Sequence, residues 1–235
     1  MLLAVALVAA ACGGDDDDAA APDESERLSL TFMAGFRAQS NLPFIAAYVA
    51  EQEGFFDAVG LDVTIRHSAG QGEHVRLLLA GDIGVTTQPA SELLQRRSDP
   101  GAPLVAVALF GQTGDLGYAV LADSGITSPA DFAGKVVGFK GVVQAEFLAM
   151  LRAHGLSEDD IDLVTTGFNP VVLSEGELDV YPVFLSNEPD TLERVIGVPV
   201  RVFQAADFGV PTLGVTYVVS EDFLASAQKR EALRR

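Results

Sequence analysis

A corner between a predicted strand and a predicted helix places amides among aromatic rings. In the stretch FRAQSNLPF, Gln39, Ser40 and Asn41 lie between Phe36 and Phe44, just after the apolar run LSLTFMA. Amides offer donors and acceptors in fixed directions and rings offer flat apolar faces, so together they suit a flat heterocycle. We therefore predict that this corner is one wall of a small-molecule site, in which Gln39, Asn41 and Phe44 contact the ligand.

A glycine-rich turn, SAGQGEH, follows the next predicted strand and precedes a predicted helix. Backbone N–H groups at the start of a helix can hold an anion or the polar edge of a ligand, and Gln71 adds a side-chain amide. The turn lacks the full dinucleotide-binding fingerprint, so a tight turn that requires glycine is the alternative interpretation. We assign Gln71 to the ligand site.

Further polar and aromatic side chains stand where other predicted strands end or where the chain crosses over. Each one alone fits a helix cap, a turn or the core. Together they indicate a site, because strand ends in an open α/β sheet line one crevice. From this set we assign to the ligand Gln88, Lys140, Tyr181, Asn187, Glu188 and Asp207.

Composition and motifs exclude several classes of function. The chain contains no G-x-S-x-G, H-E-x-x-H or P-loop motif. A formal net charge of −18 over 235 residues argues against nucleic-acid binding, which needs clustered Lys and Arg. The single cysteine excludes an intrachain disulfide and a multi-cysteine zinc site, and the three histidines show no metal-ligand spacing. We expect no metal and no cofactor.

The N-terminal segment, residues 1–27, resembles a bacterial lipoprotein signal with an acidic linker. The apolar run MLLAVALVAAA is too short to span a bilayer, ends in small residues and is followed at once by Cys12, two glycines and an acidic stretch. In this interpretation Cys12 is lipidated and the linker supplies reach. No Lys or Arg precedes the apolar run, which departs from the signal pattern. The alternative is an apolar N-terminus with an incidental cysteine.

From Leu28 onward, strand and helix patterns alternate, which favours largely parallel sheets covered by helices. The alternation forms two α/β sets in tandem with a late return, and this predicts two lobes joined by two crossings, near Phe110–Gly114 and Gln204–Phe208. Residues 28–111 with 206–235 form the first expected lobe and residues 112–205 the second. The last predicted helix ends at Arg235 without a cap, so we expect the first lobe to be incomplete at its C-terminus.

The order of the motifs resembles the substrate-binding proteins related to thiamine-pyrimidine synthesis. The stretch SNLPFIAAYVAEQEGFFDAVGLDVTI carries the pattern A-x-x-x-G-F-F followed by GLDV, and the match continues through LLLAGDIGVTT, DSGITSPADFAGKVVGFKG, GELDVYPVFLSNEP and VPTLGVTYVVSEDFL. It covers nearly everything from Leu28 to the end. The resemblance implies an α/β, two-lobed periplasmic-binding-protein fold of type II, with parallel-dominated sheets flanked by helices and two crossover segments.

The same resemblance implies a function. It indicates a monomeric, lipid-anchored extracytoplasmic protein that passes a small heterocycle to the permease and ATPase of an ABC importer. The implied ligand is a thiamine pyrimidine precursor or riboflavin.

The resembling family also contains fungal enzymes that make the pyrimidine, and this sequence departs from them at two places. Their active-site histidine falls at Phe44, and their cysteine-rich run falls at GVPTLG, which has no cysteine. Both departures favour a binding protein without enzymatic activity. Two alternatives stay open: a pyrimidine-synthesising enzyme, in which Lys140 would form a Schiff base with a pyridoxal cofactor, and a sensor or structural lipoprotein without transport.

Overall fold

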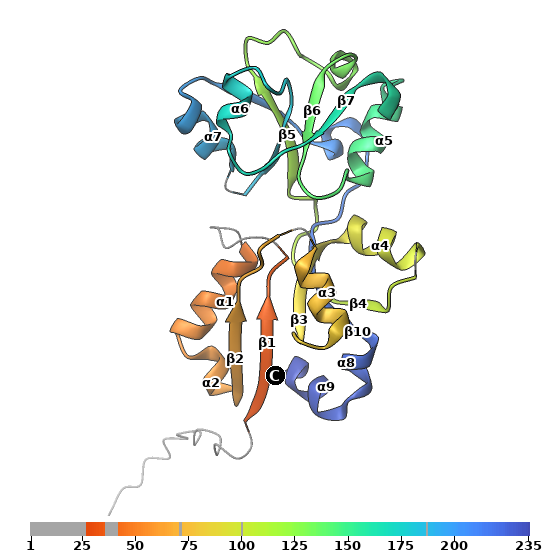
Figure 1. Cartoon of the computed structure of the whole chain (residues 1–235). Coiled ribbons are helices and arrows are strands. Elements are labelled where there is room, and N and C mark those ends of the chain that lie inside the picture. Colours follow the sequence, from red (N-terminus) through yellow and green to blue (C-terminus); the bar gives the residue numbers. More distant parts are fainter. Residues whose placement is uncertain (1–26, 36–41, 71, 100, 187) are drawn as a thin grey trace, which may run out of the picture.

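The chain folds into two α/β lobes that are joined by two segments (Figure 1). The computed structural model describes residues 27–35, 42–70, 72–99, 101–186 and 188–235. None of the helices in this described part is long and apolar enough to cross a membrane.

The first lobe is built on a five-stranded sheet in the order β2-β1-β3-β10-β4. β1 pairs in parallel with β2 and β3, whereas β10 runs antiparallel to β3 and β4. The strands are β1 (Leu28–Met33), β2 (Leu61–Arg66), β3 (Val85–Pro89), β4 (Leu104–Leu109) and β10 (Val215–Ser220).

Helices bury both faces of this sheet. Met33 and Val218 pack under α3 and α4, and their neighbours Phe32 and Val219 pack under α1 and α8 on the opposite face. Side chains alternate along a strand, so the part of a strand that is covered on both faces must be apolar, as Phe32 and Met33 at the end of β1 are, whereas Ser29 near its start is exposed. The helices are α1 (Leu42–Gln52), α2 (Phe55–Ala58), α3 (Glu73–Ala80), α4 (Ala90–Ser98), α8 (Glu221–Ala225) and α9 (Ala227–Arg234).

The second lobe repeats this arrangement with two smaller sheets. Their orders are β8-β5-β9 and β6-β7, and a parallel bridge between Val137 and Val180 joins them. The Gly138 N–H donates to the Val180 carbonyl at 2.9 Å across this junction. The strands are β5 (Leu116–Leu121), β6 (Val136–Phe139), β7 (Asp162–Thr165), β8 (Tyr181–Phe184) and β9 (Val200–Phe203).

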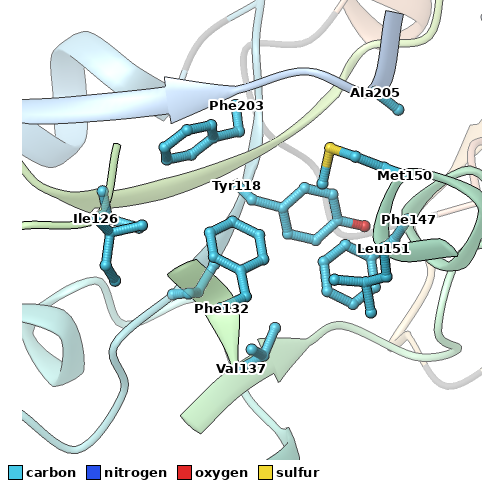
Figure 2. Packing of buried hydrophobic residues seen from close by; sticks show 11 residues of the cluster. Tyr118, Ile126, Phe132, Val137, Phe147, Met150, Leu151, Phe203 and Ala205 are labelled. Carbon is cyan, nitrogen blue, oxygen red and sulfur yellow. The ribbon is translucent and has the colours of Figure 1, made fainter. Parts of the chain in front are cut away.

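Aromatic side chains form the core of the second lobe (Figure 2). The rings of Tyr118 and Phe147 have centroids 4.3 Å apart, and Phe132 meets Phe203 edge to face at 5.4 Å. Each fully buried ring of this kind stabilises the fold by about 1.5–3 kcal/mol. The helical segments are η2 (Pro129–Phe132), α5 (Ala145–Ala153), η3 (Glu158–Asp160), α6 (Val171–Ser174), α7 (Glu188–Ile196) and η4 (Ala205–Phe208).

The expectation of parallel-dominated sheets was wrong, because β5 and β10 run antiparallel to both of their neighbours. The cause is the pair of crossings. β5 and β10 each receive the chain directly from the other lobe, so each begins at the edge of its own sheet that is nearer the crossings (Figure 1). A strand that enters from this edge runs opposite to neighbours that end there, so the five-stranded sheet is mixed and both pairings of the β8-β5-β9 sheet are antiparallel.

The two crossing segments lie backbone to backbone. The Gly214 N–H donates to the Gly111 carbonyl at 2.9 Å, and the Gly114 N–H donates to Thr212 Oγ1 at 2.8 Å. A Cβ atom on Gly214 would lie 2.6 Å from the Gly111 oxygen. Glycine at this position is therefore required by close approach.

The second crossing follows Val210 and not Gln204–Phe208, where the sequence pattern placed it. Ala205 is buried in the aromatic core of the second lobe, and Phe208 and Val210 pack against that core. Apolar burial thus holds η4 on the second lobe. We therefore propose that the chain returns to the first lobe at residue 211, and that residues 206–210 belong to the second lobe.

Candidate functional site

A cleft of about 780 Å³ lies between the two lobes. Its first-lobe wall contains Gly70 and His74, and its second-lobe wall contains Lys140 and Glu146. The crossing segments also line it, through residues such as Gly214. This volume is in the range of small-molecule sites. Among the described residues, no group of three His, Cys, Asp or Glu side chains could hold a metal ion.

Lys140 is the most elaborately held side chain of the second-lobe wall. It follows β6, is 9% exposed, and its Nζ lies 3.0 Å from both carboxylate oxygens of Glu188. Nζ also lies over the rings of Tyr181, Phe168 and Phe184, at 4.7, 4.9 and 5.6 Å from their centroids. Burial lowers the pKa of Lys140, and the attraction of Glu188 opposes this shift.

Tyr181 packs against Lys140 on the side of the lobe core. Its ring is almost fully buried, and its hydroxyl donates to the Gly167 carbonyl at 3.1 Å. Burial, and then the charge of Glu188, raises the pKa of Tyr181. Tyr181 and Glu188 therefore hold Lys140 in place, and Lys140 faces the cleft.

His74 is the buried polar residue of the first-lobe wall. It stands in the first turn of α3, directly after the glycine-rich turn, and is 5% exposed. Burial, and then the nearby charge of Arg96, lowers its pKa to about 4, while Glu73 acts in the opposite direction. His74 is therefore uncharged at neutral pH. Gly35 allows this packing, because a Cβ there would lie 3.0 Å from His74 Nε2 and 2.4 Å from the Thr87 carbonyl oxygen.

This burial predicts a pH-dependent stability. The folded pKa of about 4 lies below the ordinary value of 6.5, so between these values the unfolded chain binds a proton that the folded chain does not. Stability should therefore fall as the pH drops from 6.5 to 4, by up to about 3 kcal/mol. Urea unfolding of wild type and His74→Gln at each pH measures it. If both proteins lose the same free energy of unfolding, His74 does not titrate in this way.

One further ion pair and one hydrogen-bonded carboxylate belong to the cleft. On α4, an Arg96 guanidinium nitrogen lies 2.7 Å from Glu92 Oε1. At the first crossing, Asp115 accepts hydrogen bonds from the Ser186 N–H at 2.9 Å and the Ser186 hydroxyl at 2.8 Å. Burial raises the pKa of Asp115, and the bonds from Ser186 oppose that shift. Asp115 thereby ties the crossing to the end of β8.

The structure separates the predicted site residues into groups. Lys140 lines the cleft, and Tyr181 and Glu188 contact Lys140. Gln88 and Phe44 are fully buried and Asp207 is exposed on η4, and none of these three lines the cleft. The predictions for Gln39, Asn41, Gln71, Asn187 and Cys12 lie outside the described residues.

Phe44 is a core residue of the first lobe. Its ring stacks against Tyr48 and His67, with centroids 5.9 and 5.7 Å away. Gln88 is turned away from the cleft because its strand neighbours Thr87 and Pro89 line it, and side chains alternate along a strand. The geometry therefore does not support Phe44, Gln88 or Asp207 as ligand contacts.

Several residues of the cleft were missed at the level of sequence. Lys140 was selected because it follows the end of a strand. The same reasoning applies to the start of α5, the next helix, where Gln144 and Glu146 lie. His74 is the last residue of the motif SAGQGEH, and our interpretation of that motif considered only its glycines and Gln71. The missed polar residues include His74, Glu92, Arg96, Asp115, Gln144 and Glu146.

Comparison with known proteins adds relatives in sequence. The model of the family described as "NMT1/THI5 like" matches residues 41–235. Riboflavin-binding protein RibY of Chloroflexus aurantiacus is 30% identical over 203 residues, which cover 83% of this chain and 56% of that protein. The formylaminopyrimidine-binding protein of Halalkalibacterium halodurans is 27% identical over 179 residues, 74% of this chain and 54% of that protein. The chain thus spans little more than half the length of these relatives.

Solved structures add a likeness in fold. The alkanesulfonate-binding protein SsuA of Xanthomonas axonopodis pv. citri, bound to MOPS, superposes with a TM-score of 0.64 at 19% identity and covers 88% of this chain and 71% of that one. At this identity the likeness shows the fold alone. The two-lobed periplasmic-binding-protein fold of type II expected from the sequence is confirmed.

Proposed function

Because the chain belongs to the NMT1/THI5-like family, we propose that it is the solute-binding protein of an ABC importer. It binds a small, uncharged aromatic heterocycle between its lobes and delivers it to the permease. It has no enzymatic activity. A thiamine pyrimidine precursor or riboflavin is the ligand, and the names of the two relatives support this choice.

The observation that carries this proposal is the cleft with polar side chains on both walls. His74 stands on one wall and Lys140 on the other, and Phe168 and Phe184 supply aromatic surface. A ligand that contacts both walls stabilises the closed form, because only closure makes both sets of contacts. The permease then recognises the closed shape.

The charges of the cleft favour an uncharged ligand. Within the described part of the chain, Arg96 and Lys140 are the lysine and arginine side chains that line the cleft. Each already has a carboxylate partner, Glu92 and Glu188 respectively. An anionic ligand would have to compete with these partners and would meet their negative charge. This cleft therefore suits a neutral heterocycle better than a sulfonate.

Non-enzymatic binding is supported by Phe44. This residue, which stands where the enzymes carry a histidine, is buried in the first-lobe core. A phenyl ring cannot transfer a proton. The ion pair with Glu188 also opposes loss of the Lys140 proton, whereas a Schiff-base lysine must become an uncharged amine.

Isothermal titration calorimetry on the full chain tests the proposal. The panel contains riboflavin, 4-amino-5-hydroxymethyl-2-methylpyrimidine and formylaminopyrimidine, with thiamine, whose thiazolium ring is positively charged, as the cationic comparison and MOPS as the anionic one. We expect at least one neutral heterocycle to bind with a dissociation constant of about 1 μM or below, and MOPS to bind at least about 100-fold more weakly. A folded protein that binds none of them, or prefers MOPS, would overturn the proposed ligand class.

We further propose that Cys12 carries the lipid anchor and that the protein is held outside the cytoplasmic membrane as a monomer. The apolar run before Cys12 and the acidic linker after it support this attachment. Cys12→Ser should abolish labelling by a radioactive fatty acid and move the protein from the membrane fraction to the soluble fraction. Labelling that survives this substitution would refute lipidation at Cys12.

A further inference from the structure

Three buried polar atoms without a hydrogen-bond partner in the described structure belong to residues that line the cleft. They are His74 Nδ1 on the first-lobe wall, and Gln144 Oε1 and Glu146 Oε2 on the second-lobe wall. His74 is 5% exposed and Gln144 is 8% exposed. Gln144 is the N-cap of α5 and Glu146 stands in its first turn. The three atoms therefore belong to rigid elements of opposite lobes.

Unpartnered buried atoms of this kind are costly. Each destabilises the folded state, and native proteins keep few of them without a reason. Gln88 Oε1 and Ser91 Oγ are also unpartnered, but neither residue lines the cleft. The coincidence of three such atoms on facing walls of one cavity indicates that a bound molecule supplies their partners.

The three atoms differ in whether they can accept or donate a hydrogen bond. The Gln144 amide nitrogen donates to the Val142 carbonyl at 3.4 Å, which leaves the amide oxygen as an acceptor without a partner. The Glu146 carboxylate accepts hydrogen bonds and cannot donate. The second-lobe wall therefore offers two acceptors and requires donors from the ligand. The neutral His74 ring can offer either a lone pair or an N–H at Nδ1, according to its tautomer.

We infer that His74, Gln144 and Glu146 determine specificity in this cleft, and that they select an uncharged heterocycle with an N–H or amino edge. This inference rests on the proposed function. The donor edge of the ligand bonds to Gln144 Oε1 and Glu146 Oε2, and the opposite edge bonds to His74. A ligand that presents acceptors alone to the second lobe leaves the two oxygens unpaired and is rejected.

The inference also explains why closure depends on the ligand. His74 is fixed to the first lobe and the two oxygens are fixed to the second, so one ligand must reach both to satisfy all three atoms. A ligand that satisfies one wall alone gains nothing from closure. The atoms that select the ligand are therefore the same atoms whose contacts with the ligand stabilise the closed form.

Calorimetry with paired probes tests this assignment on the full chain. Riboflavin is compared with 3-methylriboflavin, and the hydroxymethyl aminopyrimidine is compared with its 4-dimethylamino analogue, because each analogue lacks the N–H donor. We expect the analogue of whichever parent binds to lose about 10- to 100-fold in affinity, in line with a hydrogen bond to a charged group. An analogue that binds as tightly as its parent overturns the inference.

Variants then identify the acceptor. Glu146→Leu should weaken the parent by about 10- to 100-fold, and it should remove the difference between parent and analogue, which a purely structural role of Glu146 would leave intact. Gln144→Leu and His74→Phe should each weaken the parent by about tenfold. Glu177→Leu, on an exposed carboxylate of the same lobe, should change nothing. Glu146→Met, which has a similar length and lacks the carboxylate oxygens, replaces Glu146→Leu if the latter unfolds.

The outcomes separate this inference from the proposed function. Wild-type protein that binds neither parent contradicts the proposed function itself. Wild-type protein that binds a parent, while all three variants bind it equally well, contradicts the inference alone.

Discussion

Replacing Lys140 with methionine should lower the free energy of unfolding by about 3 kcal/mol. The substitution leaves the Glu188 carboxylate, which is 17% exposed, without the cation that lies 3.0 Å from both of its oxygens. A buried charge that loses its partner costs about 3–5 kcal/mol, and the remaining exposure and the hydrogen bond from the Phe184 N–H place the effect at the lower end. Urea unfolding followed by circular dichroism measures the change.

The same lobe offers a matched control and a rescue. Lys135 and Asp179 are 4.0 Å apart, and their side chains are 36% and 41% exposed. Lys135→Met should therefore cost less than about 1 kcal/mol. Adding Glu188→Gln to Lys140→Met should recover much of the lost stability, because it removes the unpaired charge. Equal costs for Lys140→Met and Lys135→Met would show that the buried pair has no special role.

Gly214→Ala should destabilise the protein by about 2–3 kcal/mol through the packing of the crossings. The new Cβ would lie 2.6 Å from the oxygen and 2.7 Å from the Cα of Gly111. Both atoms belong to the backbone, so they cannot rotate away as a side chain does, and the crossing segments must separate. Because Gly214 also lines the cleft, ligand affinity should fall with stability.

Gly167→Ala is the control for this substitution. Gly167 also lines the cleft, but a Cβ there meets no atom within 4 Å, and its φ angle is not in the left-handed region. Its melting temperature should stay within about 2 °C of wild type, whereas Gly214→Ala should melt several degrees lower. Equal melting temperatures for the two variants would contradict the role of glycine at the crossing.

The sequence allowed the lobes, most elements and part of the site to be predicted, because these depend on local patterns. Apolar runs separated by amphipathic helices indicated the alternating α/β order. The strand-end rule selected Lys140 and Glu188, which lie far apart in sequence, and the structure brings them together in an ion pair. Such a rule works because strand ends in one sheet share an edge.

What escaped prediction depends on contacts between distant segments. His74 is buried because α3 packs beside Gly35, and nothing local marks that approach. Asp207 was misplaced because apolar packing of η4 holds the segment on the second lobe. The prediction that Gln88 contacts the ligand was avoidable, because side chains alternate along β3 and Thr87 and Gln88 therefore lie on opposite faces of the sheet.

The central claim is that one ligand contacts both walls of the cleft. Hydrogen–deuterium exchange with mass spectrometry, on the full chain with and without a saturating ligand from the calorimetric panel, tests it most directly. We predict slower exchange of the amides in both Gly72–Val75 and Phe139–Phe147, with unchanged exchange in α9, which is remote from the cleft (Figure 1). A saturated protein in which either wall exchanges at its unliganded rate would contradict the account.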